Sequence, residues 1–437
     1  MSVYKYWCMF FLAGSALTVA LPWTWSQTPQ NQRPDVPRQD RSSPLTIELT
    51  ANRKEASSAP DPSKYNPLQK QMYVCARRGG DWLQRANRGD GRFVYGYLPS
   101  LKAEMEGDHY LRQAGAAVAL AREARFIGNE RHAAVARQAL LTLLLETSLE
   151  QDGRTRHTTL PSTVVNRLAS AGLLVLAINE LPSPGEDLLQ QSEQLCAFIG
   201  RQQRADGSLS YLDVDPSRPT GTPVVAEDPD GINYYPGEAL YGLMRSQQRR
   251  PAEWKITLVR KALAYYLPWW RQHKNMALVP WHTAAYAEAF LATKDHVFAD
   301  AVNEMTDWMC GLQYVTLDAR HPFWMGGFMS WQDGKPSATP PQVSSASYAE
   351  GLAEACRVAR QAGDVVHYNR FRESLERCLQ FLATLQYTDA NTQHFADWYR
   401  PTLLGGFFAS HQDGNLRIDY TQHAVCAMVQ YLNYVVD

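Results

Sequence analysis

Carboxylates and histidines recur in this chain at one kind of position, the start of a small and apolar helical stretch. The segment NYYPGEALYGL at 233–243 places Glu238 there, and Gln113, Glu288, Glu350 and His423 align with it by hand. A helix N-terminus favours a negatively charged group. Glycoside hydrolysis needs two carboxyl groups across the bond that breaks, so Glu238 is predicted to be one of them.

The second carboxyl group is expected to come from Glu350, Asp419 or Asp230. Asp230 belongs to the acidic loop YLDVDPSRPTGTPVVAEDPDGINYYPGE, where Asp-Pro-Asp-Gly is also a turn signal. Asp419 begins the last helical stretch, in RIDYTQH, where capping the helix is its alternative role. For Glu238 the alternative is a structural cap or an ion pair with Arg112 or Arg167.

Histidine, tyrosine and arginine allow two other chemistries. His282 in PWHTAAYAE and His423 could act as the two bases of a sugar epimerase, because moving a proton between opposite faces needs groups that titrate near neutral pH. Tyr234, Tyr235, Arg417 and His423 could instead serve a polysaccharide lyase acting on uronic acids. In the hydrolase interpretation, His423 and Arg417 position the sugar.

Aromatic residues are abundant, with 12 Trp and 22 Tyr, and many lie in segments expected to be loops. Flat apolar faces suit sugar rings, although loops also use them to pack against each other. The side chains expected to bind substrate are Tyr234, Tyr235, Trp281, His282, Glu288, Trp324, Trp331 and Arg417. The expected partner is therefore a carbohydrate.

Several other classes of site lack their motifs. The sequence has no GxxxxGK[ST] phosphate loop, no GxSxG segment, and no HExxH or EF-hand spacing. Six cysteines follow the N-terminal segment without a CxxC pair, so we expect buried free thiols and no zinc site. Lys plus Arg total 43 and Asp plus Glu total 44, which offers no basic surface for nucleic acid. We expect no obligatory cofactor and no metal site, although the acids of the long loops could bind Ca²⁺.

The N-terminus, MSVYKYWCMFFLAGSALTVALPWTWSQ, has one lysine before an apolar run from about Trp7 to Leu21. This pattern indicates a signal peptide over residues 1–27, with an uncleaved membrane anchor as the alternative. Residues 28–65 are rich in Gln, Pro, Ser and Arg and are predicted to be a disordered linker. Residues 66–437 form the expected domain of a protein that is periplasmic or secreted, or tethered to the membrane by its N-terminus.

From Pro67 onward the apolar residues repeat with helical periodicity. The predicted helices span residues 67–87, 110–127, 130–147, 160–181, 185–204, 232–248, 252–274, 281–294, 297–314, 344–362, 367–388 and 419–435. Tight turns such as Ile-Gly-Asn and Ala-Gly-Asp alternate with long loops. Because successive helices run antiparallel, the long loops are expected at one end of the bundle.

The long loops share the segments GDGRFVY, ADGSLSY, GGFMSWQDG and GGFFASHQDG, which are turn signals first. Recurrence of one helix–loop–helix unit indicates a repeat architecture. Helices that follow the long loops become rich in Ala and Gly after a polar first turn, so they can crowd around an axis, while the alternate helices carry charged stripes. These features predict an all-α (α/α)6 toroid of six helical hairpins, with polar groups ringing its mouth.

In hairpin number, loop motifs and small-residue inner helices, the chain resembles the six-hairpin glycosidase-like superfamily over about residues 67–437. The outline is also similar to sugar 2-epimerases and terpenoid cyclases, but the Asp-x-Asp-Asp cluster and Gln-Trp repeats of cyclases are missing. The resemblance implies an active site in the funnel at the long-loop end. The predicted function is carbohydrate processing, with hydrolysis ahead of epimerisation or lyase chemistry. A non-catalytic glycan- or envelope-binding toroid is the non-enzymatic alternative, because a fold does not determine a function.

Overall fold

The computed structural model describes residues 60–160, 165–211 and 230–436. The expected signal peptide or anchor and most of the expected linker lie outside these ranges. The described residues belong to one compact unit, Ser57–Asp437. No helix in the described part of the chain is both long enough and apolar enough to cross a bilayer.

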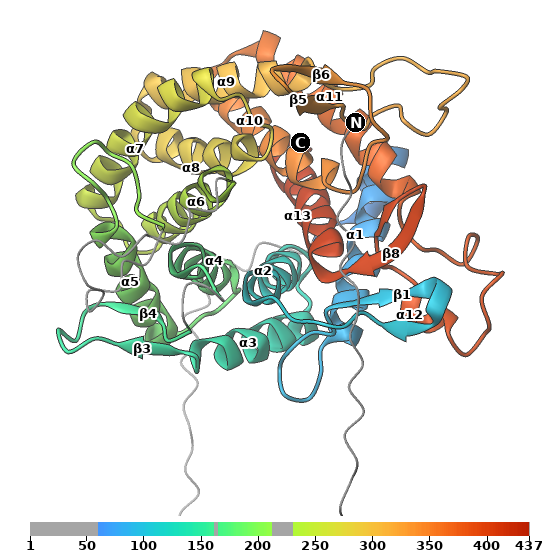
Figure 1. Cartoon of the computed structure of the whole chain (residues 1–437), viewed down its shortest axis with the longest axis horizontal. Helices are drawn as coiled ribbons and strands as arrows, with labels where there is room; N and C mark the ends of the chain where they lie inside the picture. Colours follow the sequence, from blue (N-terminus) through green and yellow to red (C-terminus); the bar gives the residue numbers. More distant parts are fainter. Residues whose placement is uncertain (1–59, 161–164, 212–229, 437) are drawn as a thin grey trace, which may run out of the picture. The chain divides into compact units, whose positions relative to one another are not determined.

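Twelve helices of the described chain form two concentric rings (Figure 1). The inner ring consists of α2 (Tyr110–Ile127), α4 (Arg167–Glu180), α6 (Tyr235–Gln247), α8 (Leu278–Thr293), α10 (Ser345–Ala362) and α13 (Ile418–Tyr434). Each inner helix contacts two inner neighbours, and α13 contacts α2, which closes the ring. The predicted (α/α)6 toroid is therefore confirmed.

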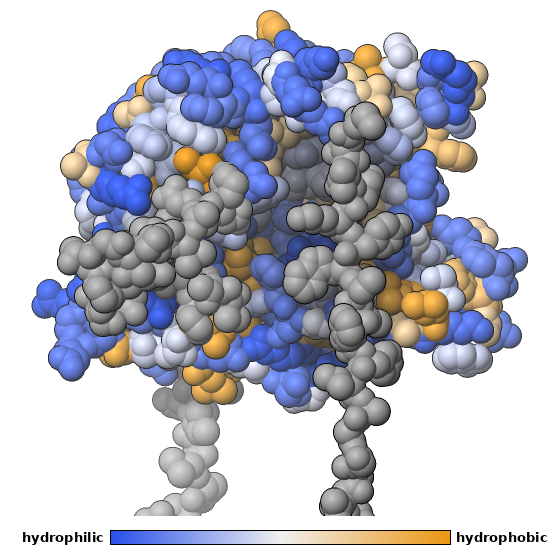
Figure 2. All heavy atoms as spheres, in the orientation of Figure 1, coloured by the Kyte–Doolittle hydropathy of each residue, from blue (hydrophilic) through white to orange (hydrophobic). Residues whose placement is uncertain are grey.

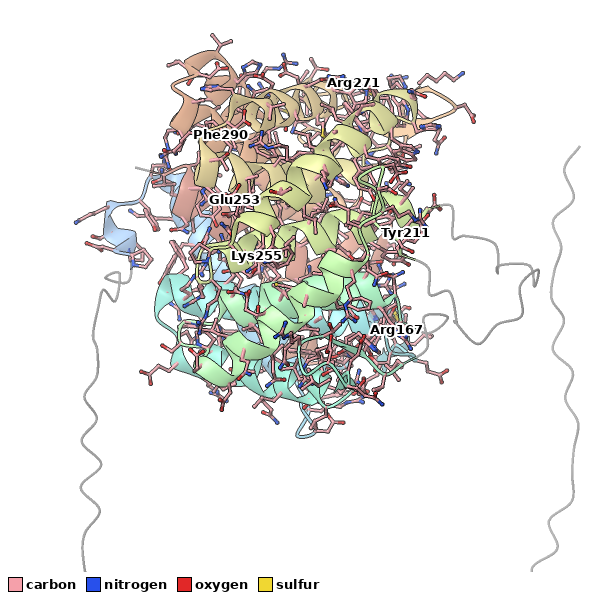
Figure 3. The ribbon with its side chains drawn as sticks, turned by 90° about the vertical axis from the view of Figure 1, so that its left-hand side faces the viewer. Arg167, Tyr211, Glu253, Lys255, Arg271 and Phe290 are labelled. Atoms are coloured by element: carbon pink, nitrogen blue, oxygen red, sulfur yellow. The ribbon has the colours of Figure 1, made fainter. Side chains whose placement is uncertain are left out.

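The outer ring consists of α1 (Pro67–Ala86), α3 (Glu130–Leu144), α5 (Glu186–Arg201), α7 (Glu253–Gln272), α9 (His296–Cys310) and α11 (Val365–Thr384). Outer helices carry the expected charged side chains, as Figure 3 shows for Glu253 and Arg271 of α7. Arg271 donates to both carboxylate oxygens of Glu304 on α9, at 2.8 and 2.5 Å. On the face seen in Figure 2, hydrophilic residues predominate and hydrophobic ones form small patches.

At two helices the observed start differs from the predicted one because a capping side chain sets it. Helix α4 begins at Arg167 and not at residue 160, because the Asn166 side chain accepts a hydrogen bond from the Ala169 N–H at 3.0 Å. Helix α11 begins at Val365, earlier than predicted, because Asp364 caps it by accepting from the His367 N–H. The one-turn helix α12 (Arg400–Leu403) and the 3-10 turns η1 (Pro62–Lys64), η2 (Pro99–Leu101) and η3 (Gly231–Asn233) were not predicted.

Short antiparallel strands occupy the connections between helices. They are β1 (Gly96–Leu98), β2 (Ala103–Glu104), β3 (Thr147–Leu149), β4 (Arg156–Thr158), β5 (Ser330–Gln332), β6 (Lys335–Ser337), β7 (Phe408–Ser410) and β8 (Asp413–Arg417). The sheet of order β2-β1-β8-β7 joins the first long loop to the last, with Gly96 opposite Arg417. This pairing ties the beginning of the toroid to its end.

The recurring glycine segments are confirmed as turns. Four long loops each hold a glycine with positive φ, namely Gly91, Gly207, Gly326 and Gly405. The carbonyl of each glycine accepts a side-chain amide hydrogen bond from the end of the preceding outer helix, from Asn87, Gln203, Gln313 and Gln386 respectively. One turn therefore repeats around the ring and starts each long loop.

Small residues allow the inner helices to approach closely. A Cβ atom on Gly242 of α6 would lie 2.1 Å from the backbone oxygen of Gly172 on α4, and one on Gly172 would lie 2.5 Å from the oxygen of Glu238. A larger side chain at either glycine would push these helices apart. The close packing holds the first turn of α6, and with it Glu238, at the wall of the central space.

The six described cysteines are free, and five are buried, in agreement with the free-thiol prediction. Burial raises the pKa of the thiols, for example to about 12 for Cys196. These side chains act as small apolar groups in the core.

Candidate functional site

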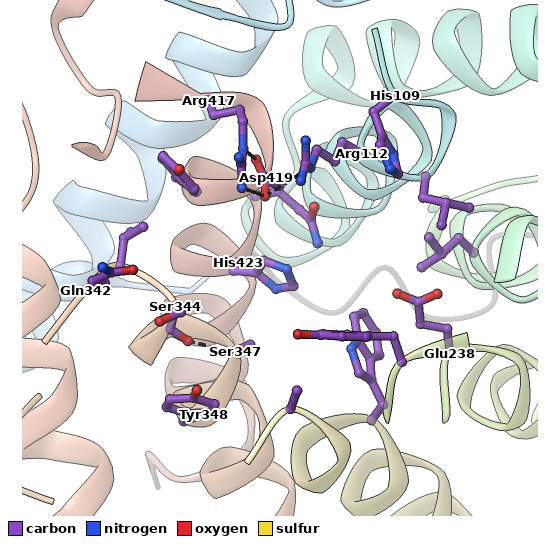
Figure 4. Close-up of a pocket in the computed structure, with 18 of the residues that line it drawn as sticks. His109, Arg112, Glu238, Gln342, Ser344, Ser347, Tyr348, Arg417, Asp419 and His423 are labelled. Atoms are coloured by element: carbon purple, nitrogen blue, oxygen red, sulfur yellow. Dashed lines mark hydrogen bonds and ion pairs between the residues drawn. The ribbon is translucent and has the colours of Figure 1, made fainter. Parts of the chain in front are cut away.

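A pocket of about 420 Å³ opens where the N-terminal ends of inner helices converge (Figure 4). The first turns of α2, α6, α8, α10 and α13, or the residues just before them, contribute to its wall. The antiparallel alternation of the chain brings these ends together on the side of the long loops. Its size is typical of a site for a small ligand.

Glu238, the fourth residue of α6, lies in the pocket wall with only 7% of its surface exposed. Its Oε2 atom is buried and has no hydrogen-bond partner in the part of the chain that the structure describes. Burial raises the pKa of this carboxyl to about 7, against the smaller opposing effect of the nearby His423. A carboxyl group of this kind carries a proton near neutral pH and can donate it.

His423 lies between Glu238 and Asp419 in the pocket (Figure 4). Its Nδ1 is 2.6 Å from Oε1 of Glu350, while the pocket side of the ring is half-buried. Although burial lowers the pKa of His423, the hydrogen bond and the charge of Glu350, together with the nearby acids, raise it overall. Glu350 therefore fixes the orientation of the imidazole and favours its charged form.

Asp419 faces the pocket between two arginines (Figure 4). Arg417 donates to both of its oxygens, at 2.6 and 2.8 Å, and Nε of Arg112 lies 3.3 Å away. The two guanidinium groups hold this carboxylate in a fixed orientation through charge-assisted hydrogen bonds. Arg112 thus pairs with Asp419 and not with Glu238, the alternative considered from the sequence.

Aromatic side chains form much of the remaining wall. Trp281 of α8 lies edge-on to His423, with ring centres 6.0 Å apart. Tyr234, Tyr235, Tyr348 and Tyr420 also face the pocket, and the guanidinium of Arg417 lies 4.3 Å from the centre of the Tyr420 ring. Acid/base groups beside such flat faces suit a sugar ring.

A network of buried ion pairs supports this site from below. Arg122 of α2 reaches Glu350 at 3.4 Å, Glu180 at 2.9 Å and the hydroxyl of Tyr241 at 2.8 Å. Arg122 and Glu180 are both buried. Since ion pairs this deep are costly to break, they hold Glu350, and through it His423, in place.

Two residues predicted to bind substrate lie away from the pocket. Glu288 is the eleventh residue of α8, too far along the helix for its mouth, and it is 2% exposed between Arg245 and Arg357, at 2.7 and 2.8 Å. His282 is buried with Nδ1 2.9 Å from the Tyr286 hydroxyl, and burial lowers its pKa to about 3. Neither side chain lines the pocket, because Glu288 lies too far along α8 and His282, although next to the pocket-lining Trp281, is directed into the core against Tyr286.

Trp324, Trp331 and Asp230 also do not line the pocket. Trp324 stacks on His321 with ring centres 4.0 Å apart, and Trp331 packs against Trp308 of the outer helix α9 at 5.2 Å. Asp230 precedes η3. The two tryptophans therefore serve loop packing, the competing role considered from the sequence.

Other predicted residues lie beneath the site or outside the described chain. Glu350 holds His423 and is not itself part of the main wall. Gln113, which the alignment grouped with Glu238, bonds the backbone of Phe93. The loop acids Asp213, Asp215, Glu227 and Asp228 lie outside the described residues.

The sequence interpretation missed several residues that line the pocket. They are His109, Arg112, Gln342, Ser344, Ser347, Tyr348 and Gln422. Most lie in the first turn of an inner helix or just before it, the same location as Glu238 and Asp419. A search restricted to polar side chains in those turns would have found them. Among the described residues no cluster of His, Cys, Asp and Glu is arranged to hold a metal ion.

The chain matches no protein-family model and no curated protein sequence. Solved structures do match. An unsaturated glucuronyl hydrolase specific for heparin aligns with a TM-score of 0.56 and 12% identity, covering 84% of this chain and 98% of that one. A cellobiose 2-epimerase from Bacillus thermoamylovorans B4167 aligns with a TM-score of 0.56 and 10% identity, covering 83% and 99%.

A third match is an inactive variant of the α-1,6-mannanase of Salegentibacter sp. HEL1_6 in complex with α-1,6-mannotriose. It aligns with a TM-score of 0.54 and 9% identity, covering 83% of this chain and 99% of that one. All three are six-hairpin (α/α)6 toroids. This chain has the six-hairpin (α/α)6-toroid fold. The resemblance seen in the sequence is thereby confirmed as a likeness of fold. Because one fold hosts many reactions, the residues of the pocket determine the chemistry of this toroid.

Proposed function

We propose that this toroid is a carbohydrate-processing enzyme, a glycoside hydrolase whose general acid is Glu238. The supporting observation is that one pocket holds two carboxyl groups in opposite environments. Oε2 of Glu238 is buried with no hydrogen-bond partner among the described residues, whereas Asp419 is held by two arginines. Such a difference favours Glu238 as the proton donor and gives Asp419, fixed by the arginines, the role of its partner.

In this mechanism Glu238 protonates the oxygen of the leaving sugar. Asp419 stabilises the positive charge that develops on the sugar ring or activates a water molecule against it. The two remaining candidates for the second carboxyl are less suitable, since Glu350 is engaged by His423 and Asp230 does not line the pocket. His423 and Trp281 position the sugar, one through a hydrogen bond and the other through its flat face.

Sugar epimerisation is the second candidate, and the His423–Glu350 pair favours it. A histidine whose Nδ1 is held by a carboxylate presents its other nitrogen as a proton carrier. The predicted pair of histidines does not form, because His282 is buried outside the pocket. Glu238 and His423 would be the two proton-transfer groups instead.

The proposed activity is tested by incubating the purified full-length protein with a panel of oligosaccharides in D2O and following the products by NMR. Hydrolysis releases new reducing ends, and the first anomer formed reports inversion or retention. Epimerisation places deuterium on a sugar carbon without releasing a fragment. We expect hydrolysis that is lost in Glu238→Gln.

The matched control is Glu253→Gln, which changes a first-turn glutamate on the outer helix α7. Hydrolysis that persists in Glu238→Gln would refute its role as the acid. Binding without turnover, unaffected by Glu238→Gln, would instead support the glycan-binding alternative. Export to the periplasm or beyond belongs to the same proposal, and it is tested by fractionating cells that produce the full chain.

A further inference from the structure

The inner helices around the pocket differ from most outer helices in how their N-termini are satisfied. Four outer helices, α1, α3, α9 and α11, have an Asn or Asp side chain that accepts hydrogen bonds from first-turn N–H groups. The five inner helices whose first turns line the pocket, α2, α6, α8, α10 and α13, have no side-chain cap. Their N–H groups and positive dipole ends are therefore turned toward the pocket without a capping side chain.

The arginines of the pocket add an unbalanced charge. Arg112 and Arg417 share a single carboxylate, that of Asp419, so one positive charge remains. Burial lowers the pKa of the neighbouring His109 and keeps that ring neutral. Arg417 uses Nε and one terminal nitrogen on Asp419, and Arg112 uses Nε on Asp419 and one terminal nitrogen on the Tyr95 hydroxyl.

One terminal nitrogen of each guanidinium thus has no hydrogen bond within the described part of the chain. Both arginines line the pocket. Planar N–H donors of this kind are suited to a carboxylate. The unpartnered and buried oxygen of Glu238, in the same pocket, independently indicates that a ligand completes the site.

We propose that the sugar bound in this pocket is acidic, and that Arg112 and Arg417 bind its carboxylate while Glu238 faces the bond to be broken. This inference rests on the proposed function and adds the class of substrate. The uncapped inner helices strengthen the same preference, since their dipoles point positive charge at the ligand. A neutral sugar would leave the extra guanidinium charge in the pocket unmatched.

The test measures binding separately from turnover. Trisaccharides of glucuronic and galacturonic acid are titrated into the full-length protein beside their methyl esters, which have nearly the same shape and no charge. Binding is followed by calorimetry or by the fluorescence change of Trp281, which lines the pocket. We expect at least one uronate to bind about tenfold or more tightly than its ester, the value of a charge-assisted hydrogen bond.

Arg112→Gln should remove most of this preference, because Asp419 then neutralises the one arginine that remains. Arg112→Lys, which keeps the charge, should retain part of it and guards against a loss caused by misfolding. Arg271→Gln is the control, since Arg271 pairs with its carboxylate in the same bidentate way on the outer ring.

Equal binding of uronate and ester would overturn the proposal, as would a preference that Arg112→Gln leaves intact. A sulfated neutral sugar that binds more tightly than every uronate would also overturn the assignment to a carboxylate. Hydrolysis of neutral glycans without charge preference would refute this inference while leaving the proposed function standing. Selective uronate binding without any turnover would support the acidic ligand while refuting the proposed hydrolase function.

Discussion

Replacing Glu238 with Gln should make the protein more stable at alkaline pH while removing its activity. The pKa of Glu238 is raised by burial from its ordinary 4.5 to about 7. The folded protein therefore holds a proton that the unfolded chain has already lost between these values, and stability falls as pH rises from 4.5 to 7. Above that window the loss is constant.

The size of this loss follows from the same two values. At about 1.4 kcal/mol for each pH unit, the wild-type protein loses about 3 kcal/mol of unfolding free energy across the window. The glutamine side chain of the Glu238→Gln variant cannot ionise, and it occupies nearly the same volume as the glutamate. The variant should therefore match the wild type at about pH 4.5 and exceed it by about 3 kcal/mol at about pH 8.5.

The assay is urea unfolding of both proteins at several pH values, with the difference in free energy plotted against pH. Other titrating groups cancel in this difference because both proteins contain them. Glu253→Gln on the outer ring should show no comparable pH dependence. If the difference in unfolding free energy between wild type and Glu238→Gln stays constant from acid to alkaline pH, burial does not raise the pKa of Glu238 and the prediction is refuted.

Three further predictions address the surroundings of the site and the fold. His423→Asn removes a positive charge that lowers the pKa of Glu238, so the Glu238→Gln stability difference should develop at higher pH in that background; an unchanged midpoint would contradict the coupling. Burial alone would lower the pKa of His132, but its two flanking carboxylates raise it to about 9. The charged His132 therefore stabilises the folded protein fully below pH 6.5, and this contribution is lost as the pH rises through about 9. His132→Gln should lower the melting temperature more at about pH 6 than at about pH 10. Gly326→Ala should cost about 1–3 kcal/mol in urea unfolding, because φ is 89° and the new Cβ would lie 2.2 Å from a backbone oxygen of α11, whereas Gly334→Ala, with φ 73° and open space around it, should cost less.

The architecture could be predicted because its causes are local in the sequence. Helical periodicity, the small residues of the inner helices and the repeated glycine turns each act within one helix–loop unit. Gly207 and Gly326 are examples, since the turn each one makes depends on its own φ and on a side chain at the end of the preceding helix. When this unit repeats, each unit can bury its apolar face against the next, and closing the ring also buries the apolar faces of the first and last units.

The site could be predicted only in part. Glu238, Asp419, His423 and Arg417 were selected from the sequence because they lie near helix starts, and they line the pocket. Trp281, Tyr234 and Tyr235 were selected as flat faces for a sugar, and they line it too. Glu288 and His282 were selected in the same way and do not line it. On α8 the pocket-lining Trp281 is the fourth residue, His282 is the next one, and Glu288 lies seven residues after Trp281. Both the face of the helix and the depth along it decide which side chain reaches the pocket, and a hand alignment resolves neither.

The sequence by itself determined the helical hairpins, the end of the bundle where the long loops gather, and the residue types available there. Only the tertiary structure decided which of those residues meet. Glu350 and His423 are far apart in the chain, and their contact exists because α10 packs against α13. The raised pKa of Glu238 arises in the same way, because desolvation depends on the neighbouring helices that exclude water from its carboxyl group.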